Sequence, residues 1–338
     1  MDNIFIFSNE SVSKNLENYN CDNLDIKSIS EGLGVNFKVN LIARKSIIER
    51  KHSIEKIKIE LAENIFSFLK LTFKSLKEKK NSKYFIISIT PFTFAACIFL
   101  FIFNVRPKVY LRSNGYEEYY SIFGIIGKFV YHLMFEINSK ISDLISCRKH
   151  ILKGKDGNIV SPSHLSEKWF QNLSKPNLEN INLLYVGRIR VEKGVFSFFE
   201  IFDKLRENIK LSIVCTNIDN KKIKSVKKIN LIDTLSENAL IDTYDKNNIF
   251  VLPSFTEGHP QVLDEALSRL RPVIVFEEIS HVTRNRKGIF VCKRNYKDFE
   301  DKLNYIINNY TEIQNSMKMN KLPTKKDFLI QLKTFLLK

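Results

Sequence analysis

The stretch NLLYVGRIRVEKG, residues 182–194, decides the fold class of this chain. It begins as a short run of apolar and β-branched residues, passes through Gly187 into a basic turn, and ends at Gly194, just before the apolar run VFSFF. The first part is typical of a buried strand, and the residues after the turn have the apolar content of a buried helix. We therefore interpret the stretch as a strand followed by a turn and a helix, the first half of a βαβ unit.

The rest of the second half repeats this alternation of strands and helices. The pattern predicts strands at 182–187, 211–215, 229–232, 249–252, 273–276 and 289–292, and helices at about 194–206, 236–246, 260–270 and 296–309. Strands separated by helices of this length form right-handed βαβ units and a parallel sheet. Ligands of such sheets bind beyond the carboxyl ends of the strands, which is where we expect the functional residues.

The first half of the chain shows a similar alternation. We expect strands at 4–7, 26–29, 84–89 and 108–111, and helices at about 92–103 and 122–135. The most apolar segment, 84–105, is long enough to cross a bilayer as one helix. Pro91 instead favours a strand, a turn and a buried helix, because proline is tolerated in the first turn of a helix and excludes the preceding residue from it.

Composition narrows the class of protein. The chain has 338 residues, of which 44% are hydrophobic and 27% charged, so it is globular and long enough for two domains. Its five cysteines form no C-x-x-C pair, so we expect neither a zinc site nor a disulfide framework, and a cytoplasmic location. The segment MDNIFIFSNE does not resemble a signal peptide. A turn-rich stretch at 153–163 leads us to predict domains at 1–170 and 171–338.

Half of the net charge of +16 belongs to the first half of the chain, where residues 38–83 account for the whole excess of basic residues. Apolar residues between Ile54 and Leu76 recur at steps of three and four, with lysines on the other faces, which predicts one amphipathic helix. This helix either packs on its own domain with a solvated lysine face or faces an anionic membrane surface, and both can hold together. No nucleic-acid-binding module accompanies the charge, so we expect no nucleic acid partner.

Two motifs follow predicted strands of the second half. In VGRIRVEKG, residues 186–194, Arg188 and Lys193 lie in a turn before a helix, and two cations beside a helix N-terminus suit a diphosphate. A solvated basic turn is the alternative.

In SFTEGHPQVLDEAL, residues 254–267, Glu257 lies in a loop and Glu265 in the helix that Pro260 opens, so both can point toward one crevice. Carboxylates accept hydrogen bonds from sugar and ribose hydroxyls. Taken alone, such a pair of glutamates can arise by chance.

Together the motifs resemble those of the GT4-type retaining glycosyltransferases, in their nucleotide-sugar-binding domain. The resemblance covers about 180–310 and rests on G-R-x4-K-G from Gly187 to Gly194, on E-x7-E at Glu257 and Glu265, and on the apolar strand VIVF that follows. It implies an α/β fold of GT-B architecture, with two Rossmann-like domains facing each other across a cleft. Residues 1–170 would form the acceptor-side domain, and residues 171–338 the nucleotide-sugar-binding domain with a terminal helix after Pro323.

The resemblance also implies roles for individual residues. The family residues that match Arg188 and Lys193 bind the donor diphosphate and stabilise the departing charge. The glutamate matching Glu257 contacts the donor sugar, and the one matching Glu265 contacts the ribose hydroxyls. We accordingly expect catalysis from Arg188, Lys193 and Glu257, and donor binding from these three together with Gly187, Gly258, His259 and Glu265.

This chain departs from the family pattern directly after Gly258. His259 and Pro260 follow there, where the family often has an aromatic residue and a glycine, so backbone contacts to the sugar and phosphate are rearranged in this interpretation. The position of His259 beside the phosphate site favours a hydrogen-bonding or positioning role over proton transfer. On the acceptor side the family's histidine has no clear match, and Arg112 and His132 are weaker candidates.

The implied reaction moves a hexosyl unit from a nucleoside diphosphate sugar to a hydroxyl of a glycan or lipid-linked acceptor, with retention, in cell-envelope polysaccharide or lipopolysaccharide synthesis. No DxD-type acidic cluster follows a strand, so we expect no metal, and no cofactor besides the donor. We place the enzyme in the cytoplasm, peripheral on the inner face of the membrane through residues 38–83. The alternatives are a sugar-nucleotide epimerase or phosphorylase of the same fold, and a non-catalytic membrane-surface relative.

Overall fold

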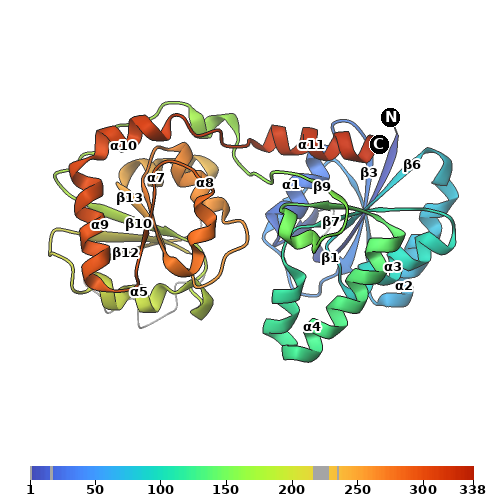
Figure 1. Ribbon diagram of the computed structural model, residues 1–338. Coiled ribbons are helices and arrows are strands. Elements are labelled where there is room, and N and C mark those ends of the chain that lie inside the picture. The colour runs from blue at the N-terminus through green and yellow to red at the C-terminus, as the bar shows by residue number, and fades with distance from the viewer. Residues whose placement is uncertain (1, 16–17, 216–227, 234–235) are drawn as a thin grey trace. The chain divides into compact units, whose positions relative to one another are not determined.

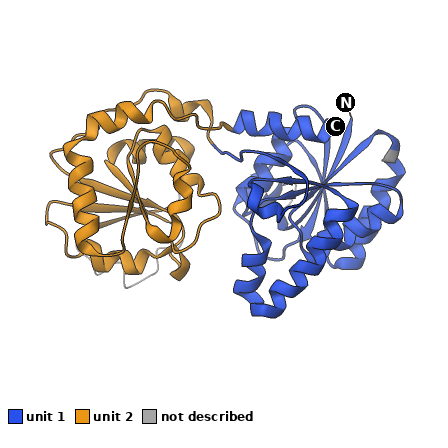
Figure 2. Cartoon of the chain, viewed as in Figure 1, with its two compact units in different colours: residues 1–164, 325–338 blue, residues 165–324 orange. Residues whose placement is uncertain are grey.

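The computed structural model describes residues 2–15, 18–215, 228–233 and 236–338, and it divides into two compact units (Figure 2). Unit 1 comprises Met1–His164 together with Lys325–Lys338, and unit 2 comprises Leu165–Thr324. The first junction lies a few residues before the predicted boundary at 170. The prediction that 171–338 forms one domain is wrong for its last helix, which belongs to unit 1.

Unit 2 is built on a parallel sheet of six strands in the order β12-β11-β10-β13-β14-β15 (Figure 1). The strands are β10 (Asn182–Val186), β11 (Lys210–Val214), β12 (Ile229–Ile232), β13 (Ile249–Leu252), β14 (Val273–Phe276) and β15 (Ile289–Cys292). The strand order runs in opposite directions from β10 and from β13. The loops after these two strands therefore diverge, and the crevice between them is where sheets of this topology bind ligands.

Helices flank this sheet, and β13 and β14 are buried at every position. The helices are α5 (Val195–Phe202), α7 (Glu237–Lys246), α8 (Gln261–Ser268), α9 (Tyr296–Asn308) and α10 (Tyr310–Met317), with 3-10 helices at Glu167–Phe170, Val191–Lys193 and Glu277–Thr283. Strands covered on both faces have continuous apolar runs, which is why the sequence located them well. Four of the six predicted strands have the predicted bounds, whereas α5 ends four residues before the predicted 206.

Unit 1 has a nine-stranded sheet whose parallel part runs β5-β3-β1-β6-β7-β8-β9. Strands β2 and β4 extend it by antiparallel pairing beyond the end of β1. The strands are β1 (Asn3–Asn15), β2 (Asn18–Cys21), β3 (Lys38–Lys45), β4 (His52–Ile54), β5 (Lys58–Ala62), β6 (Ser82–Ile87), β7 (Lys108–Leu111), β8 (Asp143–Ser146) and β9 (Gly157–Ile159).

Two buried clusters lie on opposite faces of this sheet. One is formed with α1 (Leu24–Leu33) and α11 (Lys325–Leu337), and the other with α2 (Ile65–Ser75), α3 (Pro91–Ile102) and α4 (Gly115–Ile141). Short 3-10 helices follow at Leu76–Asn81 and Lys149–Leu152. Unit 1 is thus a second α/β layer structure, with helices on both faces of a mainly parallel sheet (Figure 1).

The last helix, α11, packs on unit 1 through one apolar stripe. Phe328, Leu332 and Leu336 recur every four residues and are buried in the cluster that includes α1. A Cβ built on Gly32 of α1 would lie only 2.4 Å from the side chain of Leu329, so the two helices approach closely. No sequence motif predicts this burial, which is the reason that α11 belongs to unit 1 rather than to unit 2.

The predicted strand at 26–29 is wrong, because these residues form part of α1. Asn23 caps this helix, its Oδ1 accepting from the backbone N–H groups of Asp25 (3.0 Å) and Ile26 (3.4 Å). Ile26, Ile29 and Leu33 then share the buried face at helical spacing.

The amphipathic helix predicted between Ile54 and Leu76 is wrong over its first half. Ile54 ends β4, and Lys58–Ala62 forms β5. Only Ile65–Ser75 is α-helical, beginning at a capping box in which Asn64 and Ser67 bind each other's backbone N–H groups. Apolar residues that recur at steps of three and four over so short a segment also fit two short strands. Pairing with the other strands of the sheet decided between helix and strand.

The apolar segment 84–105 folds as Pro91 led us to predict, with strand β6 followed by helix α3. Thr90 caps α3 and Pro91 is its first residue. Across the residues that the structure describes, no helix has both the length and the apolar content needed to cross a membrane.

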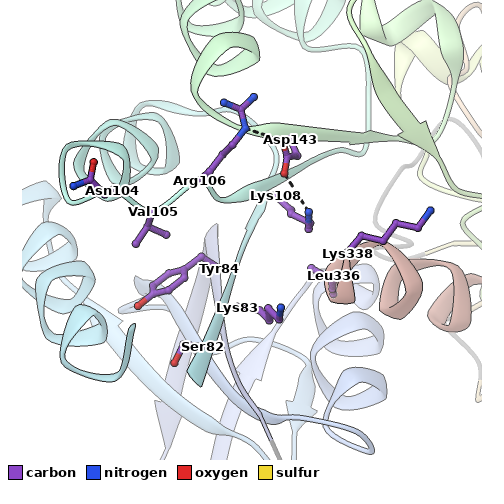
Figure 3. Close-up of a pocket in the computed structure, with 10 residues that line it drawn as sticks. All are labelled: Ser82, Lys83, Tyr84, Asn104, Val105, Arg106, Lys108, Asp143, Leu336 and Lys338. Atoms are coloured by element: carbon purple, nitrogen blue, oxygen red, sulfur yellow. Dashed lines mark hydrogen bonds and ion pairs between the residues drawn. The ribbon is translucent and has the colours of Figure 1, made fainter. Parts of the chain in front are cut away.

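A pocket of about 320 Å³ opens at the amino-terminal edge of the sheet of unit 1 (Figure 3). Arg106 and Lys108 both contact Asp143 there, at 2.7 Å (Nε–Oδ1) and 3.1 Å (Nζ–Oδ2). These ion pairs engage two of the four basic side chains that line the pocket, and the pocket lies at the strand ends opposite to those that bind ligands in parallel sheets.

Candidate functional site

The two motifs of the second half meet at the carboxyl edge of the sheet, because β10 and β13 are neighbours. Gly194, at the start of α5, has φ +63°, and a Cβ there would lie 2.0 Å from the carbonyl oxygen of Pro253. The N–H of Phe255 donates to the carbonyl oxygen of Glu192 at 3.0 Å. Only glycine fits at position 194, and its absence of a side chain lets the basic turn and the glutamate loop touch.

Lys193 and Glu257 form a largely buried ion pair at this contact. Nζ of Lys193 lies 2.7 Å from Oε1 of Glu257, and the two side chains are 22% and 9% exposed. The hydroxyl of Ser254 donates to the same Oε1 at 2.6 Å, and Nε2 of His281 lies 2.9 Å from the backbone carbonyl oxygen of Glu257. Two of the predicted site residues are therefore brought together, and the carboxylate is held in one orientation before any ligand arrives.

Arg188 lies on the exposed side of the same turn. Its carbonyl oxygen accepts a 2.8 Å hydrogen bond from the hydroxyl of buried Tyr185, whereas its guanidinium makes no hydrogen bond or ion pair with any described residue. Burial raises the pKa of Tyr185, and the negative charge of Glu257 adds to the shift, so this hydroxyl stays protonated as a donor. Of the turn's three cations, Lys193 and Arg190 are thus paired with glutamates, whereas Arg188 is not.

Glu265 is held from α7 rather than by the other predicted site residues. Its Oε2 lies 2.9 Å from the hydroxyl of Tyr244, a fully buried residue that also lies 3.1 Å from the carbonyl oxygen of Val262. Burial, together with the charge of Glu265, raises the pKa of Tyr244 well above its usual value. The tyrosine fixes the rotamer of Glu265 on α8. That Glu257 and Glu265 face one ligand stays a prediction.

His259 takes part in a charged network beside the glutamate loop. Its Nδ1 lies 2.7 Å from Nη2 of Arg284, and its Nε2 is 3.7 Å from Oδ2 of Asp264, a buried carboxylate that also pairs with Arg286. Such fixed contacts on both ring nitrogens suit a positioning role. Gly258 has open space around its Cβ position, so the fold itself does not require glycine there.

Arg294 ties the site together and was missed by the sequence analysis. It follows β15, donates from Nη2 to Pro253 O (2.9 Å) and from Nη1 to Ser197 Oγ (3.0 Å), and lies 4.2 Å from the ring centroids of Phe255 and Phe276. Its position directly after a predicted strand was a usable signal. Ser254, Tyr244 and His281 gave no comparable signal, because only the fold brings them to the predicted residues.

Two helices that begin beside these loops lack side-chain caps. Ser236 caps α7 and Asn295 caps α9, but neither α5 nor α8 receives a side-chain hydrogen bond at its N-cap. Uncapped N–H groups at a helix N-terminus attract anions, and a bound phosphate or carboxylate can satisfy them. The arrangement is chemically suited to an anionic ligand with hydroxyl groups.

Other site chemistries find less support in the described residues. Over 2–15, 18–215, 228–233 and 236–338, no group of three or more His, Cys, Asp and Glu side chains is placed to hold a metal ion. In unit 1, Arg112 pairs with Asp25 at 3.2 Å. His132 lines a separate cavity of about 500 Å³ along α4, with Nδ1 at 2.9 Å from the hydroxyl of Tyr116. Sequence analysis had named both residues without a geometric reason.

Comparison with known proteins agrees with this geometry. Residues 180–309 match the family described as glycosyl transferases group 1. An uncharacterized glycosyltransferase of Haemophilus influenzae is 24% identical over 275 residues, which cover 76% of each chain. Among solved structures, the lipopolysaccharide outer core galactosyltransferase WaaB superposes with a TM-score of 0.68 at 15% identity, covering 100% of this chain and 99% of that one. Anabaena HepE in complex with UDP and glucose gives 0.67 at 10%, covering 100% and 98%.

Both structural neighbours share the arrangement of elements rather than the sequence, so they identify the fold. The family match covers the basic turn, both glutamates and the strands between them. Taken together, these likenesses support a glycosyltransferase of GT-B fold, with residues 180–309 similar to the glycosyl transferases group 1 family.

Proposed function

We propose that the chain transfers a hexosyl unit from a nucleoside diphosphate sugar to a hydroxyl group with retention of anomeric configuration and without a metal ion. The observation that carries the proposal is the Lys193–Glu257 contact at the point where the strand order reverses. It joins a phosphate-binding type of side chain to a hydroxyl-binding one in a largely buried place. In HepE, a neighbour of the same fold, the crystals contain UDP and glucose.

The charges of the site suit a diphosphate donor. A diphosphate carries at least two negative charges, and the Lys193–Glu257 pair is neutral by itself. The guanidinium of Arg188 and the uncapped N–H groups of α5 supply the remaining positive potential. As the bond between the anomeric carbon and the diphosphate oxygen breaks, negative charge grows on that oxygen. Groups already oriented toward it stabilise the transition state without reorganising.

The two glutamates have different roles in this mechanism. Glu257, with Oε1 fixed by Lys193 and Ser254, orients the donor sugar and stabilises positive charge on its ring. Glu265, fixed by Tyr244, accepts hydrogen bonds from the ribose hydroxyls. The backbone at Gly187 and Gly258 gives close access to the phosphates and sugar, and His259 positions the glutamate loop. No protein nucleophile is part of the proposal.

For the acceptor we propose a hydroxyl of a glycan or a lipid-linked glycan, used in the synthesis of cell-envelope polysaccharide or lipopolysaccharide. Such acceptors are anchored at the cytoplasmic face of a membrane, and the basic segment 38–83 gives unit 1 an attraction for anionic lipid. In the structure, exposed Lys70 and Lys74 lie on α2 within that segment. We therefore propose that the enzyme is a peripheral protein of the inner membrane surface.

The donor site is tested by calorimetry with a panel of nucleoside diphosphate sugars. We expect saturable binding of one donor by the wild type, and at least about tenfold weaker binding by Lys193→Ala, which removes a charge-assisted contact. Glu265→Ala should weaken nucleotide binding as well. Lys204→Ala is the matched control, because Lys204 is exposed beyond the other end of α5 and its removal changes net charge equally.

Two results would contradict the proposal. If Lys193→Ala and Lys204→Ala lose equal affinity, the cation acts through net charge rather than at a site. If the bound sugar nucleotide is converted to an epimer without any acceptor, the epimerase alternative holds. Retention itself is checked by the anomeric coupling constant of the product in proton NMR.

A further inference from the structure

Helix α4 has a large apolar face that no part of unit 1 covers. Beyond Gly124, Gly127, Tyr131 and Met134 lie on the face that packs on the sheet. A second face, with Lys128, His132 and Glu136 at four-residue steps, lines the cavity along α4. Between residues 125 and 137 the third face is exposed and carries large apolar side chains, namely Ile125, Ile126, Phe129, Val130, Leu133 and Ile137.

The most exposed part of this face surrounds a bend. Gly124 has φ +62°, which interrupts the helix, and Figure 1 shows the two segments of α4 meeting there at an angle, away from the sheet. Ile122 and Phe123 before the bend and Ile125 and Ile126 after it are all exposed. The stretch 119–127, YYSIFGIIG, contains no charged residue. The bend therefore presents a compact apolar tip.

The surroundings of this tip identify its partner by charge and composition. Tyr119 and Tyr120 begin the uncharged stretch, and exposed Lys128 directly follows it. Unit 1 also carries the basic segment 38–83. Apolar side chains accompanied by lysines and tyrosines are the composition of segments that lie in the interface of an anionic bilayer.

A second copy of the chain is a weaker fit to the same surface. With a net charge of +16, two copies repel each other, and lysines beside the apolar face would be brought together in a symmetric contact. An anionic membrane instead gains from every lysine near its surface.

We infer that the bent tip of α4 inserts its apolar side chains into the interfacial region of an anionic membrane. This insertion is distinct from the electrostatic attraction proposed for residues 38–83, because it depends on hydrophobic burial within a different element. It also does not depend on the donor chemistry of unit 2, so the two can fail separately.

Vesicle binding of the full chain tests this inference with a matched pair of variants. Ile125 and Ile126 are 78% and 75% exposed, and Val35 and Ile330, two apolar residues of unit 1 outside both α4 and 38–83, are 73% and 52% exposed. We expect I125Q/I126Q to bind phosphatidylcholine–phosphatidylglycerol vesicles about tenfold or more weakly than the wild type. V35Q/I330Q should bind like the wild type, and pure phosphatidylcholine vesicles should bind all three proteins weakly.

Depth of insertion gives an independent readout. The variant F123W places an indole at the tip, whereas the single native tryptophan, Trp169, is 3% exposed within unit 2. Brominated lipid should quench the fluorescence of the introduced indole and leave that of Trp169 unchanged. Donor calorimetry on I125Q/I126Q should match the wild type, which separates loss of membrane insertion from loss of the donor site.

Two outcomes would overturn the inference. Equal vesicle binding by I125Q/I126Q and V35Q/I330Q would show that the tip does not contact lipid. If the wild type does not bind vesicles but sediments as a dimer, and I125Q/I126Q is monomeric, then the apolar face of α4 joins two copies of the chain.

Discussion

Replacing Gly194 with alanine tests whether the close contact between the two site loops is required by the fold. At φ +63° the left-handed backbone costs an L-residue about 1–2 kcal/mol. The added methyl would also lie 2.0 Å from the carbonyl oxygen of Pro253, so one loop must move, and overpacking of this kind costs about 1–3 kcal/mol. We therefore expect Gly194→Ala to lower the free energy of unfolding of unit 2 by about 2–5 kcal/mol.

Urea unfolding followed by tryptophan fluorescence measures this quantity, because Trp169 is buried in unit 2 and no other tryptophan contributes. Gly258→Ala is the matched control in the facing loop. Its φ is not left-handed and no atom lies within 4 Å of the new Cβ, so we expect a change below about 0.5 kcal/mol. Equal losses in the two variants would refute the steric argument, and unaltered donor affinity in a destabilised Gly194→Ala would refute the placement of the site at this contact.

Three further predictions concern a cation, an acid and the thiols. Arg294→Lys should lower the free energy of unfolding of unit 2 by about 1–3 kcal/mol in the same urea assay. The reason is that an ammonium group cannot donate hydrogen bonds in a planar fork while it stacks on two aromatic rings. An unchanged urea midpoint would contradict this prediction. Burial raises the pKa of Asp25, but hydrogen bonds and charges from His164 and Arg112 lower it below its usual 3.8. The stability that this carboxylate contributes is therefore present above about pH 4 and is lost as the pH falls. We expect hydrogen exchange in α1 to depend less on pH between about 5 and 3 in Asp25→Asn than in the wild type. The five cysteines are buried, with the pKa of Cys21 raised to about 11 and of Cys97 and Cys292 to about 12, so dithionitrobenzoate should label the chain only after denaturation.

The sequence predicted unit 2 much better than unit 1, for a physical reason. Strands such as β13 and β14 are buried on both faces, so their apolar runs were short, continuous and bounded by turn residues. In unit 1, β5 is only partly buried and its burial does not alternate regularly, and the isoleucines around it fit helix and strand periodicity equally. Hydrogen bonding to β3, a contact between distant residues, decided the outcome.

The candidate site shows the same division between local and distant information. Lys193 and Glu257 were found because each lies in a local motif after a strand, and the fold placed them 2.7 Å apart. The residues that hold them, including Ser254 and Arg294, were not singled out, because their contacts depend on the three-dimensional arrangement. The apolar tip of α4 was interpreted as part of an ordinary helix, because periodicity does not reveal that a helix will be covered on one side only.

The return of α11 to unit 1 determines the order in which the units can be completed during synthesis. Unit 1 begins first, yet the side chains of Phe328, Leu332 and Leu336 that fill one of its two cores are made last. Until they arrive, the apolar face of α1 on the growing chain lacks its partner. Unit 2 is continuous in sequence and can fold as soon as it has left the ribosome. Unit 1 therefore stays unfinished while the whole of unit 2 is synthesised, and the apolar face of α1 is exposed during that interval.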